Sequence, residues 1–149
     1  MLIQPFTALS KDQVPVFVLN EKEQLEKHPF LKLLSKEDRA FALAFEKKSP
    51  IRAAHSHLVF VPSGREIILI GAPEKKKFHH RKALLLARRI VSFARSERVK
   101  NAAVHIADFT ASDAPRERGK LVEVIATQFE LANFEFITYK APPPEGWSF

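Results

Sequence analysis

The sequence predicts a layered α/β domain built around one buried central strand. Residues 67–70 read Ile-Ile-Leu-Ile, so this strand is apolar on both faces and needs helices on each side of it. A turn-forming segment at residues 62–65 joins it to the apolar run at residues 58–61, which predicts a β-hairpin. Between Phe78 and Arg98 the pattern changes to that of a strongly amphipathic helix. A hairpin followed by a helix of this kind favours an α/β architecture.

Length and composition fit one ordinary domain with a substantial core. The chain has 149 residues, of which 46% are hydrophobic, so a disordered chain is not expected. It has no cysteine, which excludes disulfides, a thiolate nucleophile and iron–sulfur clusters, and makes a cytoplasmic location the default expectation. No apolar run approaches the roughly 20 residues that cross a bilayer. We therefore expect no membrane partner, and the N-terminus does not resemble a secretory signal.

The first half of the chain is expected to form a strand and a helix. Residues 14–19 read Val-Pro-Val-Phe-Val-Leu, which is typical of a buried strand with Pro15 at its start or on an edge. The segment Ser35 to Asp38 has the spacing of a capping box, in which a hydroxyl and a carboxylate satisfy free N–H groups. A helix from Lys36 to Lys48 is predicted, and Pro50 ends it.

The second half is expected to hold a strand between two helices. Five apolar residues share one side of the helix at residues 78–98: Ala83, Leu86, Ala87, Ile90 and Ala94. A strand is expected at residues 102–107 and a second helix at residues 115–132, with Asp113 and Pro115 marking its start. The Pro-rich tail from Ala141 to Trp147 has the composition of an extended linker.

The basic charge is concentrated in one segment. The chain carries 24 Lys and Arg against 17 Asp and Glu, and ten of the basic residues but only one acidic residue lie between Lys75 and Lys100. The candidate basic binding face consists of Lys77, Arg81, Arg88 and Arg95. We favour a solvated face that meets an acidic surface of an adjoining domain or partner subunit. Nucleic acid is the second interpretation, because such a face neutralises phosphates.

A weak candidate metal site is the pair His55 and His57. On a strand, residues two apart point to the same face, so both imidazoles could bind one ion together with a third ligand. No third ligand is evident from the sequence, and a structural role is favoured. The carboxylates considered for acid–base chemistry form no catalytic constellation: Asp108, Asp113, Glu117 and Glu123. No catalytic residue is therefore predicted.

An ordered set of segments resembles the N-terminal domain of the leucyl aminopeptidase (cytosol aminopeptidase) family. The set begins with Ile67 to Gly71, continues with Arg81 to Ala83 at the start of a long Ala/Arg-rich helix, and includes Val99 to Val104. It closes with the segment Phe129 to Lys140. The resemblance is strongest between Glu66 and Lys140.

The resemblance implies a three-layer α/β/α sandwich with a mixed sheet, similar to macro domains. It implies a single α/β domain at residues 1–140 and a linker at residues 141–149 that leads to a C-terminal catalytic domain. In the family, that second domain holds two divalent metal ions, zinc or manganese, and releases N-terminal amino acids from peptides. The family's metal-site stretch, Asn-Thr-Asp-Ala-Glu-Gly-Arg, is absent from this sequence. No catalytic or metal-binding residue is therefore carried over, and no cofactor is expected in this chain.

The expected function follows from this resemblance. The chain is expected to be a non-catalytic N-terminal domain of a leucyl aminopeptidase-like metalloexopeptidase, which contributes to active-site access and to assembly with sister subunits, a hexamer in the family. The alternative is a stand-alone binding module that uses the basic face at residues 75–100 for nucleic acid or another acidic partner. A third possibility, ADP-ribose binding, is disfavoured because the sequence has no Gly-rich phosphate cradle.

Overall fold

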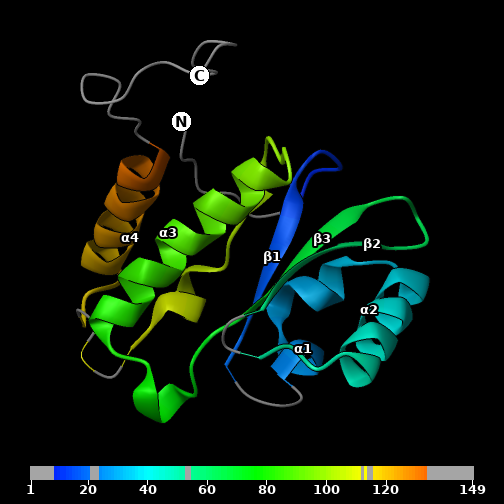
Figure 1. The fold of residues 1–149 in the computed structure, drawn as a ribbon, viewed down its shortest axis with the longest axis horizontal. Coiled ribbons are helices and arrows are strands. Elements are labelled where there is room, and N and C mark those ends of the chain that lie inside the picture. Colours follow the sequence, from blue (N-terminus) through cyan, green and yellow to red (C-terminus); the bar gives the residue numbers. More distant parts are fainter. Residues whose placement is uncertain (1–8, 21–23, 53–54, 112, 114–115, 134–149) are drawn as a thin grey trace.

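The structure is a computed structural model that describes residues 9–20, 24–52, 55–111, 113 and 116–133. Strands and helices alternate along much of this part of the chain (Figure 1). The strands are β1 (Val14–Leu19), β2 (Ser56–Phe60), β3 (Glu66–Gly71) and β4 (Ala102–Ala103). The α-helices are α1 (Gln24–Lys27), α2 (Lys36–Lys48), α3 (His80–Ser96) and α4 (Arg118–Asn133). Three short 3-10 helices are η1 (Pro29–Leu33), η2 (Lys75–Lys77) and η3 (Ile106–Phe109).

The four described strands form one open mixed sheet in the order β2-β3-β1-β4. Strand β1 runs parallel to both β3 and β4, whereas β2 pairs with β3 as the predicted antiparallel hairpin. Pro15 is the second residue of β1 and precedes the first residue pair between β1 and β3, which joins Val16 to Ile68. The missing N–H of this proline therefore lies at the start of the strand, as predicted.

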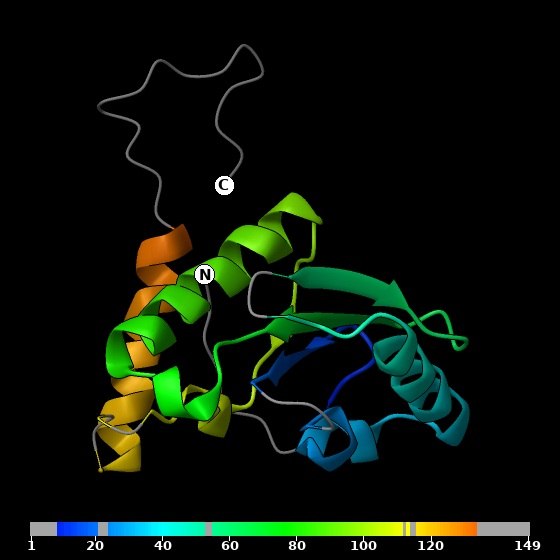
Figure 2. The ribbon, with the colours of Figure 1, turned by 60° about the horizontal axis from the view of Figure 1, so that its bottom comes forward.

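Two apolar clusters lie on opposite faces of the sheet. Side chains alternate between the faces along a strand, so Ile68 and Ile70 belong to one cluster, and Ile67 and Leu69 to the other. The first cluster is completed by α3 and α4, and the second by α1, η1 and α2. Figures 1 and 2 show α3 and α4 side by side on one side of the sheet and α1 and α2 on the other. The prediction that β3 is covered on both faces is confirmed.

Most predicted elements are present with small changes at their ends. Strand β1 and helix α2 have the predicted bounds. The long amphipathic helix begins at His80 and not at Phe78, because Phe78 is 2% exposed and fills the core ahead of the helix. The last described helix begins at Arg118. The mixed α/β class expected from the sequence is therefore confirmed.

The strand expected at residues 102–107 is wrong beyond Ala103. Pairing with β1 ends there, and the chain enters η3 at Ile106. The apolar residues that favoured a strand are used differently, since Val104 and Ile106 pack at the rim of the α3 cluster. Hydrogen bonds from His105 and His28 hold Asp108 in the turn, which competes with continued strand pairing.

The role expected for Asp113 is also wrong. Its carboxylate accepts the backbone N–H of His80 at 2.6 Å, so it caps the start of α3 rather than the start of the last helix. A carboxylate at this place also interacts favourably with the positive end of the helix dipole. Pro115, the segment after Asn133 and the linker predicted at residues 141–149 lie outside the described residues. Among the described helices, none combines the length and apolar character of a membrane span.

Asp38 ties the start of α2 to the hairpin turn. The Ser35 hydroxyl accepts the N–H of Asp38 at 3.1 Å, so Ser35 caps the helix as predicted. The Asp38 carboxylate accepts the N–H of Ser63 at 2.9 Å, and the residue is only 3% exposed. Burial raises the pKa of Asp38, but hydrogen bonds from Ser63 and Ser35 and the charge of Arg65 outweigh it, so the pKa is lowered overall.

We expect Asp38→Asn to lower the free energy of unfolding by about 1–2 kcal/mol at neutral pH, because it weakens a buried charge-assisted hydrogen bond. The folded pKa lies below the unfolded value of about 4, so the carboxylate contributes fully above that pH and loses its contribution as the pH falls through the folded pKa. Urea unfolding of the original chain and of Asp38→Asn should therefore give free energies of unfolding whose difference shrinks as the pH is lowered. The exposed neighbour Glu37→Gln is the control, and a pH-independent difference for Asp38→Asn would contradict the assignment.

Candidate functional site

The three arginines of the predicted basic face form a row along one side of α3. Arg81, Arg88 and Arg95 are exposed, and seven-residue steps on an α-helix return to nearly the same side. Arg88 donates from Nε to Gln128 of α4 at 2.9 Å, so the row runs beside α4. Lys77 lies in η2, 3.9 Å from Glu74, with both side chains well exposed. Such an ion pair contributes little, and Lys77 stays accessible to a partner.

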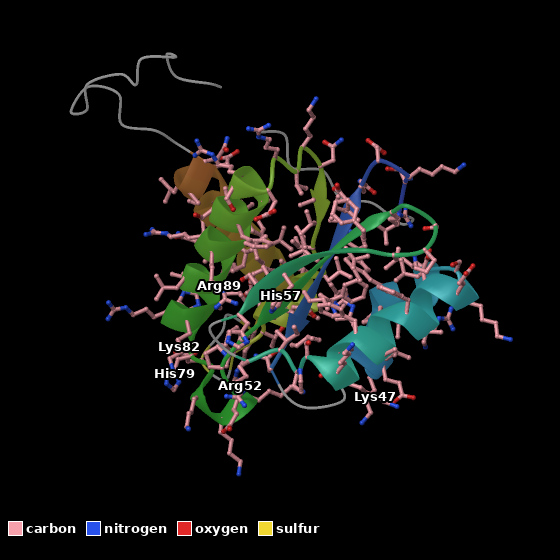
Figure 3. All side chains as sticks on the ribbon, turned by 45° about the vertical axis from the view of Figure 1, so that its right-hand side comes forward. Lys47, Arg52, His57, His79, Lys82 and Arg89 are labelled. Atoms are coloured by element: carbon pink, nitrogen blue, oxygen red, sulfur yellow. The ribbon has the colours of Figure 1, made fainter. Side chains whose placement is uncertain are left out.

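A second group of basic side chains, four lysines or arginines and two histidines, lies on another part of the surface. We call it the basic surface, and it consists of Lys47, Arg52, His57, His79, Lys82 and Arg89 (Figure 3). Lys82 and Arg89 are also seven residues apart on α3. Each directly follows an arginine of the predicted row, so they lie about 100° further around the helix. The other members come from the end of α2, the segment before β2, β2 itself and the residue before α3.

The basic surface passes around the open edge of the sheet. Strand β2 is an edge strand, and His57 on it lies against Phe45 of α2 with ring centroids 6.0 Å apart. Arg89 belongs to α3, on the opposite face of the sheet. Basic side chains on both sides of β2 therefore flank the same edge of the described sheet. A ligand that approaches this edge meets positive charge from both layers.

Arg89 joins α3 to the end of the hairpin. Its Nη2 donates to the backbone carbonyls of Gly71 and His55, which close the paired ends of β3 and β2. Burial lowers the pKa of Arg89, although a guanidinium stays charged at neutral pH. Arg89 therefore positions the edge and also carries part of the surface charge.

The histidine pair considered as a metal site lies at the start of β2. His55 and His57 meet edge to face with ring centroids 6.0 Å apart, so the structure brings the two side chains together. Within the described part of the chain, no third histidine or carboxylate completes a ligand set with them. The structural role favoured by the sequence stays a prediction for this pair, of which His57 also belongs to the basic surface.

A different cluster of titratable side chains lies where β4 gives way to η3. The Asp108 carboxylate lies between two imidazoles, with Oδ2 2.9 Å from His28 Nε2 and Oδ1 3.2 Å from His105 Nδ1. The His28 and Asp108 side chains are 2% and 8% exposed, and that of His105 is 31% exposed. His28 Nδ1 accepts the backbone N–H of Phe30 at 3.2 Å, so the ring proton lies on Nε2 and is donated to Asp108.

Sequence reasoning missed this cluster because its members are far apart in the chain. His105 and Asp108 are three residues apart, a spacing that places both on one side of a turn, and this was the available signal. His28 joins them from 80 residues away, at the N-cap of η1. Of the other carboxylates considered, Asp113 caps α3 and Glu117 pairs with Lys120 at 3.3 Å. None of these carboxylates, nor Glu123, joins the Asp108 cluster within the described residues.

Comparisons with known proteins leave the family open. No protein-family model matches the sequence, and no curated protein matches it. The functional conclusions below therefore depend on the residues of this chain and on the resemblance described above.

We expect Arg89→Met to lower the free energy of unfolding by about 1–3 kcal/mol, because two carbonyls at the hairpin end lose a charged donor. The matched control is Arg88→Met, the same chemical change one residue earlier on an exposed side of α3, for which we expect a loss within about 1 kcal/mol. Urea or thermal unfolding measures both variants. Equal losses would show that Arg89 does not hold the sheet edge.

Proposed function

We propose that this chain is the non-catalytic N-terminal domain of a leucyl aminopeptidase-like metalloexopeptidase, in which it serves assembly and access to active sites. The proposal is supported by the order of segments that carries the resemblance. Within Glu66 to Asn133, these segments form a central strand, a crossover helix, a parallel strand on the other side of β1, and a final helix. The enzyme would release N-terminal amino acids from peptides in the cytoplasm, with two zinc or manganese ions held by its C-terminal domain.

The proposal extends to the arrangement of the layers in this domain. We assign the domain to three-layer α/β/α sandwiches of the macro-domain kind. Its support is the pair of apolar clusters on opposite faces of the sheet, each closed by helices. Figure 2 gives the view in which the two groups of helices are best separated.

The observation that carries the assembly role is the basic surface around the β2 edge. Its cations come from both layers that flank the sheet, and Phe60 at the end of β2 is 62% exposed. A partner suited to this region has acidic residues around an apolar contact, because complementary charge orients two surfaces and speeds their encounter. We propose that this partner is the C-terminal catalytic domain or a sister subunit of the same enzyme.

A second candidate function is nucleic-acid binding by the row on α3. The observation in its favour is the exposure of Arg81, Arg88 and Arg95 on one side of the helix, with Lys77 accessible at its start. Cations in such a row neutralise phosphates, and their contribution falls with the logarithm of salt concentration. The row and the basic surface use different residues, so variants can separate the two functions.

We expect the 149-residue chain to show no hydrolysis of leucyl-p-nitroanilide with added manganese or zinc. The reason is that none of its residues matches the metal-site stretch of the family, so the two-metal chemistry would belong to the other domain. Release of p-nitroaniline, with the enzyme-free metal solution as control, measures the reaction. Turnover that survives repurification and disappears with chelator would overturn the non-catalytic assignment.

We expect the double variant Arg52→Glu, Lys82→Glu to lose salt-sensitive association with the polypeptide encoded downstream in the same gene, measured by co-elution after co-expression. The control, Lys32→Glu with Lys36→Glu, makes the same change in net charge on exposed residues outside the basic surface. Co-elution unaffected by the first variant would contradict the assembly role.

For nucleic acid, we expect the triple variant Arg81→Glu, Arg88→Glu, Arg95→Glu to bind with a weaker salt dependence. The negative slope of log affinity against log salt should become less steep by about 1 for each arginine that pairs with a phosphate. Titration of duplex DNA at several salt concentrations measures this slope. Binding by the original chain that disappears in the triple variant would support the second function, and a slope unchanged by the variant would contradict it.

A further inference from the structure

The cluster of His28, His105 and Asp108 has the composition of a transition-metal site. Its three candidate ligand atoms, two imidazole nitrogens and one carboxylate oxygen, all lie within 4.8 Å of one another. Two neutral imidazoles and one carboxylate are a ligand set that suits zinc, cobalt or nickel better than calcium or magnesium, which prefer oxygen.

We propose that His28 Nε2, His105 Nδ1 and Asp108 bind one divalent transition-metal ion, with Zn²⁺ as the best fit and water as the fourth ligand. Ligand atoms of a tetrahedral zinc ion with bonds of about 2.0–2.1 Å lie about 3.3 Å apart. The observed nitrogen–oxygen separations are close to this value, 2.9 Å from His28 Nε2 to Oδ2 of Asp108 and 3.2 Å from His105 Nδ1 to Oδ1, but they involve the two different carboxylate oxygens. A rotation of the Asp108 carboxylate, with all three ligand atoms already within 4.8 Å of one another, would convert the hydrogen-bonded cluster into a ligand set.

The surroundings hold the ligands in place before the ion arrives. The His28 ring contacts Phe17 and Phe30 edge to face, with centroids 4.9 and 5.4 Å apart. The His105 ring also lies against Phe30, with centroids 5.9 Å apart. These contacts limit the rotation of both imidazoles, so little side-chain freedom is lost on binding. His105 is partly exposed, so its side of the cluster is open to an ion and its water.

Binding changes the positions of two protons. In the metal-free cluster, the N–H groups at Nε2 of His28 and Nδ1 of His105 donate hydrogen bonds to the Asp108 carboxylate. An ion that takes these two nitrogens moves the protons to the other nitrogen of each ring, so the imidazoles stay neutral. For His28 this proton faces the N–H of Phe30, and the hydrogen bond of 3.2 Å between the two groups opens. Because this bond must open, His28 is the ligand that limits affinity.

The site would join two distant parts of the fold. His28 follows β1 and α1, whereas His105 and Asp108 follow β4, and Asp108 comes 80 positions after His28. A ligand that binds only the folded chain stabilises it by mass action. The ion would therefore fix the segment after β1 against η3, and it is separate from the two-metal centre proposed for the other domain.

The test is calorimetric titration of the chelator-stripped 149-residue chain with zinc chloride, together with thermal unfolding. We expect one Zn²⁺ per chain, a higher Tm with zinc, and binding weakened at least about tenfold in His105→Ala and in Asp108→Asn. The partly exposed His105 is the preferred change because removal of the buried His28 risks the fold. The matched control is His55→Ala with His57→Ala, which removes two histidines from the other pair and should bind zinc as the original chain does.

A second measurement reads the proton positions directly. Nitrogen NMR of the imidazoles should show His28 protonated at Nε2 without metal and at Nδ1 with zinc. Absence of zinc uptake, or uptake unchanged in His105→Ala and abolished in the His55 and His57 double variant, would overturn the proposal. An unchanged His28 tautomer in the presence of saturating zinc would do so as well, and would identify the cluster as a hydrogen-bonded link alone.

Discussion

The fully buried strand β3 is the constraint on which the rest of the structure depends. Each residue from Ile67 to Ile70 is 0% exposed, with two side chains on each face of the sheet. Burial of one such side chain contributes about 1.5–3 kcal/mol, and a folded domain is stable by only about 5–15 kcal/mol in total. Neither face can therefore stay open to water. Helices α3 and α4 close one face, and α1, η1 and α2 close the other.

Basic side chains gather near one edge of this sheet. The order of the described strands leaves β2 at the edge of the sheet, where the ring of Phe60 is exposed. An open edge of this kind is a place where a second copy can add by strand pairing. Lysine and arginine side chains from α2, the segment before β2 and α3 surround it, so two like edges repel each other while an acidic surface is attracted. The proposed assembly role uses this difference.

The cluster around Asp108 depends on where β4 ends. Strand β4 pairs with β1 over only two residues, and the chain then turns into η3, which brings Asp108 against the imidazole of His28. Had the strand continued to residue 107, side chains from His105 onward would have alternated between the faces of the sheet. Hydrogen bonds between strands and hydrogen bonds to the Asp108 side chain are thus alternatives for this segment, and the short β4 accompanies the second.

The sequence by itself determined the elements whose signals are local. The apolar run at residues 67–70 set strand β3, and the Ser35 hydroxyl set the start of α2. The apolar residues of α3 set its buried face. Each of these signals depends on neighbours within a few residues. Only the tertiary structure decided that Asp113 caps α3. It also divided the cations of α3 between two surfaces and placed His28 beside Asp108. These outcomes depend on which distant segments the sheet order brings together, and local periodicity carries no information about that order.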